Sequence, residues 1–112
     1  KFKNEIDEQL LDEIIEYLKE AKYLDDYQFI QKQVNEYMML KTLSIKELKY
    51  KLLEKGLDKK LVEKYIEDNQ EELEEYEKRC IEKIRRKKAE NMEEEKINQY
   101  LFRKGYPISK YE

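Results

Sequence analysis

Cations gather in one stretch of the sequence, and their number and spacing suit a functional contact. Seven of them lie within residues 78–88: Lys78, Arg79, Lys83, Arg85, Arg86, Lys87 and Lys88. Because they follow an acidic stretch at residues 71–77, one interpretation is a helix whose charges suit its own macrodipole. The other is a contact with nucleic acid or with an acidic protein surface. Composition leaves both open, and Arg103 and Lys104 extend the patch if the next helix ends nearby.

The groups that usually carry out catalysis are missing from the sequence. It contains no histidine, no glycine-rich phosphate loop and no spacing typical of metal ligands. Asp25 and Asp26 form the one conspicuous carboxylate pair, and their place before an apolar stripe favours a helix cap. Cys80 falls on an apolar stripe and is interpreted as an inert core thiol. We therefore predict that the protein is not an enzyme and needs no cofactor or metal.

The composition predicts an all-α protein. The 112 residues include only two Gly and one Pro, which leaves little room for sheet turns or long loops. A single cysteine excludes an internal disulfide and fits a reducing cytosol, so we expect a cytoplasmic protein. No stretch approaches the ~20 apolar residues that cross a bilayer, and no membrane partner is expected. The net charge of −3 is too small to indicate a partner.

A repeat organises the chain. The string Leu-Leu-Glu-Lys-Gly at residues 52–56 returns 49 positions later as Leu-Phe-Arg-Lys-Gly at residues 101–105. A second match, at an offset of 51 positions, aligns the apolar stripe of residues 6–15 with that of residues 57–66. Self-similarity at about 50 residues predicts an array of helical units that pack on one another. Such arrays usually present a long surface to a partner.

Helix signals divide the first half of the chain into four predicted helices. The first covers about residues 5–22, with an inward stripe of Ile6, Leu10, Leu11, Ile14, Ile15 and Leu18. The second is predicted to begin at an Asp25 N-cap, with Gln28 completing a capping box and Leu24 packing on Phe29 as a hydrophobic staple. Its inward residues are predicted to be Phe29, Ile30, Val34, Tyr37 and Met38. The third begins at a capping box of Ser44 and Glu47 and ends at Gly56. The fourth begins after an Asp58 cap, with Leu61, Val62, Tyr65 and Ile66 inward.

Two further helices and the start of another follow. The fifth covers about residues 70–90, and its apolar stripe is Leu73, Tyr76, Cys80, Ile81 and Ile84. The sixth covers about residues 92–104, turns Ile97, Tyr100 and Leu101 inward and ends at Gly105. Pro107 suits the first turn of a seventh helix. We expect tandem three-helix repeats in a right-handed-type helical array: residues 1–24 ending one repeat, residues 25–69 forming a complete repeat, and residues 70–112 forming a truncated one. A chain of this kind is expected to be a fragment of a longer protein.

Residues 44–68 also imitate a helix-turn-helix, because two short helices are joined by a tight turn at Gly56. A DNA-reading second helix needs basic or amide side chains. The second helix here instead has four acids, Asp58, Glu63, Glu67 and Asp68, against three lysines, Lys59, Lys60 and Lys64. This balance disfavours sequence-specific reading of DNA.

Three strings together resemble the RecX family of recombination regulators. The first is the junction Tyr23-Leu24-Asp25-Asp26-Tyr27-Gln28-Phe29. The second is Ser44-Ile45-Lys46-Glu47-Leu48, which leads into Leu52-Leu53-Glu54-Lys55-Gly56-Leu57. The third is Leu101-Phe102-Arg103-Lys104-Gly105-Tyr106. Their order and spacing, together with the three-helix period, extend the resemblance over almost the whole chain.

The resemblance implies a non-enzymatic regulator that binds the filament of the recombinase RecA, acts in its helical groove and restrains ATPase and strand exchange. It implies a place in homologous recombination, DNA repair and the SOS response. Single- or double-stranded DNA is a second expected partner, and we expect a monomer. On this hypothesis the DNA- or filament-binding residues are Lys83, Arg85, Arg86, Lys87, Lys88, Arg103 and Lys104.

Two other functions stay open from the residues alone. A stand-alone helical nucleic-acid-binding domain would bind DNA without a recombinase, with an affinity that falls steeply as salt rises. A helical protein-interaction module would bind neither DNA nor RecA. The three hypotheses differ in their binding partners and are separable by binding measurements.

Overall fold

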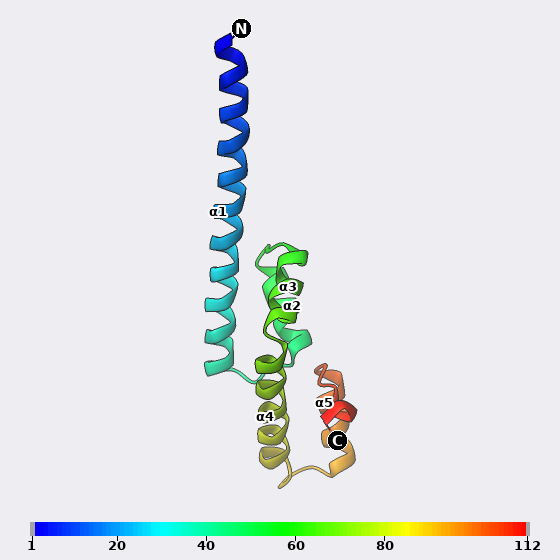
Figure 1. Cartoon of the computed structure of the whole chain (residues 1–112). Coiled ribbons are helices and arrows are strands. Elements are labelled where there is room, and N and C mark those ends of the chain that lie inside the picture. Colours follow the sequence, from blue (N-terminus) through cyan, green and yellow to red (C-terminus); the bar gives the residue numbers. More distant parts are fainter. Residues whose placement is uncertain (1, 112) are drawn as a thin grey trace.

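The protein is all-α, as the composition predicts. A computed structural model describes the backbone of residues 2–111 and the side chains of residues 8–111. Its elements are α1 (Phe2–Leu40), α2 (Ile45–Glu54), α3 (Lys59–Asp68), α4 (Gln70–Lys88), α5 (Glu94–Arg103) and the short 3₁₀ helix η1 (Ile108–Tyr111), and no strand occurs among these residues (Figure 1). The tandem-repeat arrangement and the domain limits at residues 24 and 69 stay predictions.

The predicted break between the first two helices is wrong. α1 runs through it without interruption (Figure 1). No Gly or Pro interrupts this segment, and Lys22 pairs with Asp26 across one helical turn at 2.9 Å, which supports a helix through the junction. Asp25 is therefore not an N-cap, and the expected capping box with Gln28 does not arise. The expected staple is also wrong, because Leu24 and Phe29 are exposed on one helix.

The N-terminal half of α1 extends away from the remaining helices (Figure 1). Its stripe of Leu10, Leu11, Ile14, Ile15 and Leu18, predicted to face inward, is exposed, while the side chain of Ile6 lies outside the described residues. The molecule measures 77 × 23 × 22 Å, and its radius of gyration is 20.7 Å. A compact domain of this length would have a radius of about 13 Å. The difference follows from the extension of α1.

The first core forms where the C-terminal half of α1 packs on α2 and α3. Its buried apolar residues include Ile30, Val34, Leu48, Leu52, Leu61, Val62, Tyr65 and Leu73. The predicted caps of α2 and α3 are confirmed: Ser44 and Glu47 form a complete capping box, and the Asp58 carboxylate accepts from the Leu61 N–H at 3.1 Å. These caps fix the starts of α2 and α3 beside the C-terminal half of α1.

The second core forms between α4 and α5. Tyr76, Cys80, Ile81 and Ile84 pack with Ile97, Leu101 and Tyr106, and Met38 of α1 touches both cores. Cys80 is a buried free thiol, as predicted. α4 joins the cores because its first turns contribute Leu73 to one core and its later turns contribute to the other. The predicted seventh helix is a single 3₁₀ turn within the described residues.

Candidate binding cleft

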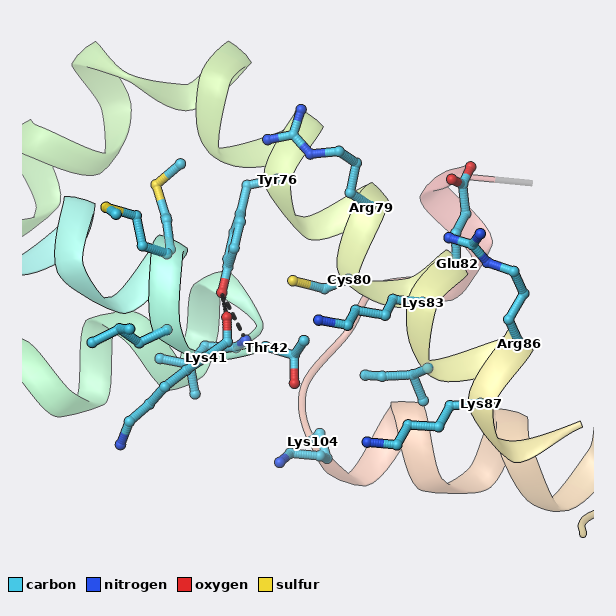
Figure 2. Close-up of a pocket in the computed structure, with 15 residues that line it drawn as sticks. Lys41, Thr42, Tyr76, Arg79, Cys80, Glu82, Lys83, Arg86, Lys87 and Lys104 are labelled. Atoms are coloured by element: carbon cyan, nitrogen blue, oxygen red, sulfur yellow. Dashed lines mark hydrogen bonds between the residues drawn. The ribbon is translucent and has the colours of Figure 1, made fainter.

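An open cleft of about 790 Å³ lies between the end of α1, the α1–α2 loop, α4 and the C-terminal end of α5 (Figure 2). Six cations line it: Lys41, Arg79, Lys83, Arg86, Lys87 and Lys104. Its apolar lining consists of Met38, Met39, Leu40, Leu43, Cys80 and Ile84. The cleft therefore combines cations with an apolar part of its lining, which we call its floor. We call the cleft as a whole the basic cleft.

The basic cleft brings together four of the seven predicted contact residues. Lys83, Arg86 and Lys87 reach it from α4, and Lys104 reaches it from the end of α5, although helix 70–88 and residue 104 are well separated in sequence. In Figure 2, Lys83 and Lys87 extend from α4 toward the side on which Thr42 and Lys104 lie. The predicted extension of the patch by Lys104 is thus a feature of the fold.

The other three predicted contact residues lie outside the basic cleft. Arg85 is half-buried on another side of α4, where it lines a shallow hollow with Tyr111. The Lys88 ammonium sits 4.2 Å from the centre of the Tyr100 ring, a cation–π distance. Arg103 is exposed on α5. Their role in binding stays a prediction. Arg85 and Lys88 point away from Lys83, Arg86 and Lys87 because successive residues of a helix such as α4 point about 100° apart.

Two cations of the cleft were absent from the predicted contact set. Arg79 precedes Lys83 by four residues, so a helical-wheel reading of α4 places them on one face. Lys41 lies in the α1–α2 loop, and only the packing of that loop against α4 brings it to the cleft. The place of Arg79 beside Lys83 follows from sequence spacing, whereas the place of Lys41 depends on tertiary structure.

Tyr76 fixes the loop that carries Lys41. Its hydroxyl donates to the Lys41 carbonyl at 2.5 Å and accepts from the Leu43 N–H at 3.0 Å (Figure 2). Burial raises the pKa of Tyr76 far above its ordinary value, so the hydroxyl remains protonated and able to donate. The loop is therefore held to α4 by two hydrogen bonds to one buried side chain.

Lys104 is positioned by the start of α2. The Ser44 hydroxyl donates to the Lys104 carbonyl at 2.6 Å, and the Lys104 ammonium lies 3.4 Å from the Glu47 carboxylate. The Ser44 hydroxyl also accepts from the Glu47 N–H at 3.1 Å. Ser44 therefore caps α2 and also binds the backbone at Lys104. One wall of the cleft is fixed to the first core by these contacts.

The α4 side of the cleft has an excess of positive charge. Among the side chains described for residues 8–111, Arg79, Lys83, Arg86 and Lys87 have no carboxylate within salt-bridge distance. Glu82 is the one acid that lines the cleft. Unpaired cations around a concavity focus positive potential and raise the local concentration of anions. The arrangement suits an anionic partner.

The part of the chain that the structure describes shows no group of three or more His, Cys, Asp or Glu side chains arranged to hold a metal ion. None of its helices combines the length and apolar character that a bilayer crossing needs.

Comparison with known proteins finds a similarity to a bacterial regulatory protein. The chain is 30% identical over 108 residues to the regulatory protein RecX of Oceanobacillus iheyensis. The match covers 93% of this chain but spans only 40% of the length of that protein. No protein-family model matches the chain. No solved structure matches it either. The similarity agrees with the resemblance drawn from the three sequence strings.

Proposed function

We propose that this protein is a RecX-like, non-enzymatic regulator that docks on the RecA–DNA filament and restrains the recombinase. The observation that carries the proposal is the match to a regulatory protein RecX along 93% of this chain. The basic cleft supplies a surface for docking, because its cations line an open concavity and most of them have no acidic partner among the described side chains. Such a surface works by binding, and restraint of ATPase and strand exchange follows from occupying the filament.

The filament suits the charges of the cleft. A RecA–DNA filament presents phosphate groups and protein carboxylates close together, so cations such as Lys83 and Lys87 would find anions on either component. Steering by the positive cleft would speed association, and the effect would weaken as salt rises. The seven cations predicted from sequence remain the candidate contacts, with Lys83, Arg86, Lys87 and Lys104 at their centre.

The test is the single-stranded-DNA-dependent ATPase of the cognate RecA, titrated with this protein. We expect a dose-dependent fall in ATP hydrolysis at ratios below one molecule per RecA subunit. The diagnostic variant is Lys83→Glu/Lys87→Glu, because both lysines are exposed in the cleft and their reversal leaves the cores untouched. It should raise the concentration needed for half-inhibition about tenfold or more, because a tenfold change corresponds to the loss of at least one charge-assisted contact.

A matched control carries the same charge change elsewhere. Lys59→Glu/Lys60→Glu alters two exposed lysines in the first turn of α3, where acids suit the helix N-terminus. It should inhibit RecA like the unmodified protein. If the unmodified protein leaves the ATPase unchanged and does not bind the filament in sedimentation, the regulator function is wrong. Binding to DNA alone, with no effect on RecA, would instead indicate the stand-alone nucleic-acid-binding domain.

A further inference from the structure

The basic cleft presents exposed apolar side chains beside its cations, which a surface that meets only phosphate does not need. Met39 and Leu40, in the last turn of α1, are 83% and 80% exposed. Met38 and Ile84 continue this lining toward the second core. Phosphate and sugar groups gain nothing from such side chains. Methionine side chains are flexible and polarizable, which suits them to take up apolar groups of varied shape.

The cleft also lacks what single-stranded nucleic acid usually needs. Bases bind by stacking on exposed aromatic faces. The aromatic side chain in the cleft is Tyr76, which is only 5% exposed and whose hydroxyl is already bonded to the α1–α2 loop. Tyr100 lines an adjoining hollow with Lys87, but its ring already faces the ammonium groups of Lys88 and Lys104, at 4.2 and 5.7 Å from its centre. The cleft lining itself therefore offers bases no exposed aromatic face. The same cations beside an apolar floor instead match a protein segment.

We propose that the basic cleft binds an acidic protein segment that inserts a large apolar side chain between the cations. The carboxylates of the segment would pair with Arg79, Lys83, Arg86 and Lys87, which lack acidic partners among the described side chains. A Leu, Met or Phe of the segment would rest on Met39 and Leu40. The proposal rests on the function proposed above and deepens it, because it assigns the cleft to the recombinase protein rather than to its DNA.

Geometry allows this mode of binding. The cleft is open and has a volume of about 790 Å³, within the ordinary range of about 300–1,000 Å³ for ligand sites. Its walls are fixed before binding, because Tyr76 holds the α1–α2 loop and Ser44 holds the backbone at Lys104. A preformed site loses less entropy when it binds a segment. A large apolar side chain that inserts into a pocket is a common anchor of a binding hot spot.

The experiment compares three labelled probes by fluorescence anisotropy against the whole chain. The first is the peptide Glu-Leu-Glu-Glu-Phe-Glu-Glu-Leu-Glu. The second has Ser in place of Leu and Phe and keeps the same charge. The third is an oligothymidylate with an equal number of negative charges. We expect the first probe to bind about tenfold or more tightly than either of the others.

Two variants separate the contributions of charge and of the floor. Lys83→Glu/Lys87→Glu should abolish binding of the first probe. Met39→Ser/Leu40→Ser should reduce its affinity to that of the Ser-substituted peptide, because the apolar floor is lost. Tyr50→Ser/Phe102→Ser removes two exposed apolar side chains that lie outside the cleft lining and should bind normally.

Four outcomes would overturn the proposal. In the first, the first peptide does not bind; in the second, the oligothymidylate binds as tightly as the peptide or more tightly. In the third, Met39→Ser/Leu40→Ser binds the peptide as the unmodified protein does. In the fourth, the protein self-associates and Lys83→Glu/Lys87→Glu abolishes that association. The last would make the occupant a second copy, whose exposed α1 stripe of Leu10, Leu11 and Ile14 is itself flanked by acids. If Met39→Ser/Leu40→Ser still inhibits RecA fully while Lys83→Glu/Lys87→Glu does not, the regulator function stands and only the acidic-segment proposal fails.

Discussion

The two copies of the repeated string end their helices alike but have different surroundings. Gly56 and Gly105 both adopt positive φ, at +85° and +92°, as helix-ending glycines commonly do. A Cβ placed on Gly56 would meet nothing within 4 Å, whereas one on Gly105 would lie 3.1 Å from the Lys46 Cβ and the Ser44 Oγ. The first copy ends in solvent, and the second packs against the start of α2.

This difference shows how a local signal acquires a tertiary role. In the first copy, the string only reverses the chain between α2 and α3. In the second, the same reversal presses Gly105 against Ser44 and Lys46 and places the Lys104 carbonyl where the Ser44 hydroxyl binds it. The junction fixes one wall of the basic cleft. Changes at the second copy should therefore affect both stability and binding, and changes at the first should affect stability alone.

The largest expected difference is at the residue after each glycine. Tyr106 is 1% exposed in the second core, whereas Leu57 is only partly buried beside the first. Tyr106→Ala should lower the free energy of unfolding by about 3–5 kcal/mol, the usual effect of removing a buried aromatic ring. Leu57→Ala should lower it by about 1 kcal/mol, since less apolar surface is lost. Urea denaturation of both variants measures the two values, and equal losses would contradict the comparison.

The sequence predicts this part of the fold well because its signals are local. The capping box of Ser44 and Glu47, the Asp58 cap and the helix-ending glycines each depend on residues a few positions apart, and all are present. The predicted break at Asp25 is wrong because a residue that can cap a helix can also lie within one. No Gly or Pro interrupts α1 there, and the Lys22–Asp26 pair favours continuation of the helix.

The candidate site is predicted less fully. The cations of α4 are visible as a cluster, yet their division between the cleft and other faces depends on the helical angle of each residue. The presence of Lys41 and of the apolar floor depends on contacts between α1, its following loop and α4, which no local pattern encodes. Tertiary packing decides which of several similar lysines share one cleft.

Substitution of the two glycines sharpens the comparison at the backbone. Gly56→Ala should cost about 1–2 kcal/mol, because a residue with a Cβ is strained at positive φ. Gly105→Ala should cost about 1–3 kcal/mol more, because its methyl group also presses on Ser44 and Lys46. Thermal unfolding followed by circular dichroism gives both costs. Equal costs for Gly56→Ala and Gly105→Ala would contradict the close contact between Gly105 and the start of α2.

The two N-caps provide the next test. Asp58→Ala should cost about 1 kcal/mol, the ordinary value for losing a cap. Ser44→Ala should cost about 2–3 kcal/mol, because it removes the cap and also leaves the Lys104 carbonyl without its hydroxyl donor. Ser44→Ala should in addition weaken binding of the acidic, apolar peptide, while Asp58→Ala should not. Stability and peptide affinity measured on the same samples distinguish these effects, and a loss of affinity in Asp58→Ala would argue against the assigned role of Ser44.

The smallest expected effect separates the ring of Tyr106 from its hydroxyl. That hydroxyl is buried and has no hydrogen-bond partner among the described residues. Burial raises the pKa of Tyr106 far above its ordinary value, because the charged form would be desolvated. Tyr106→Phe keeps the ring and removes a desolvated polar group, so stability should stay within about 0.5 kcal/mol or rise slightly. A loss above about 1 kcal/mol in urea denaturation would mean that the hydroxyl has a partner in solution, and the second copy would then be stabilised by a polar contact as well as by its ring.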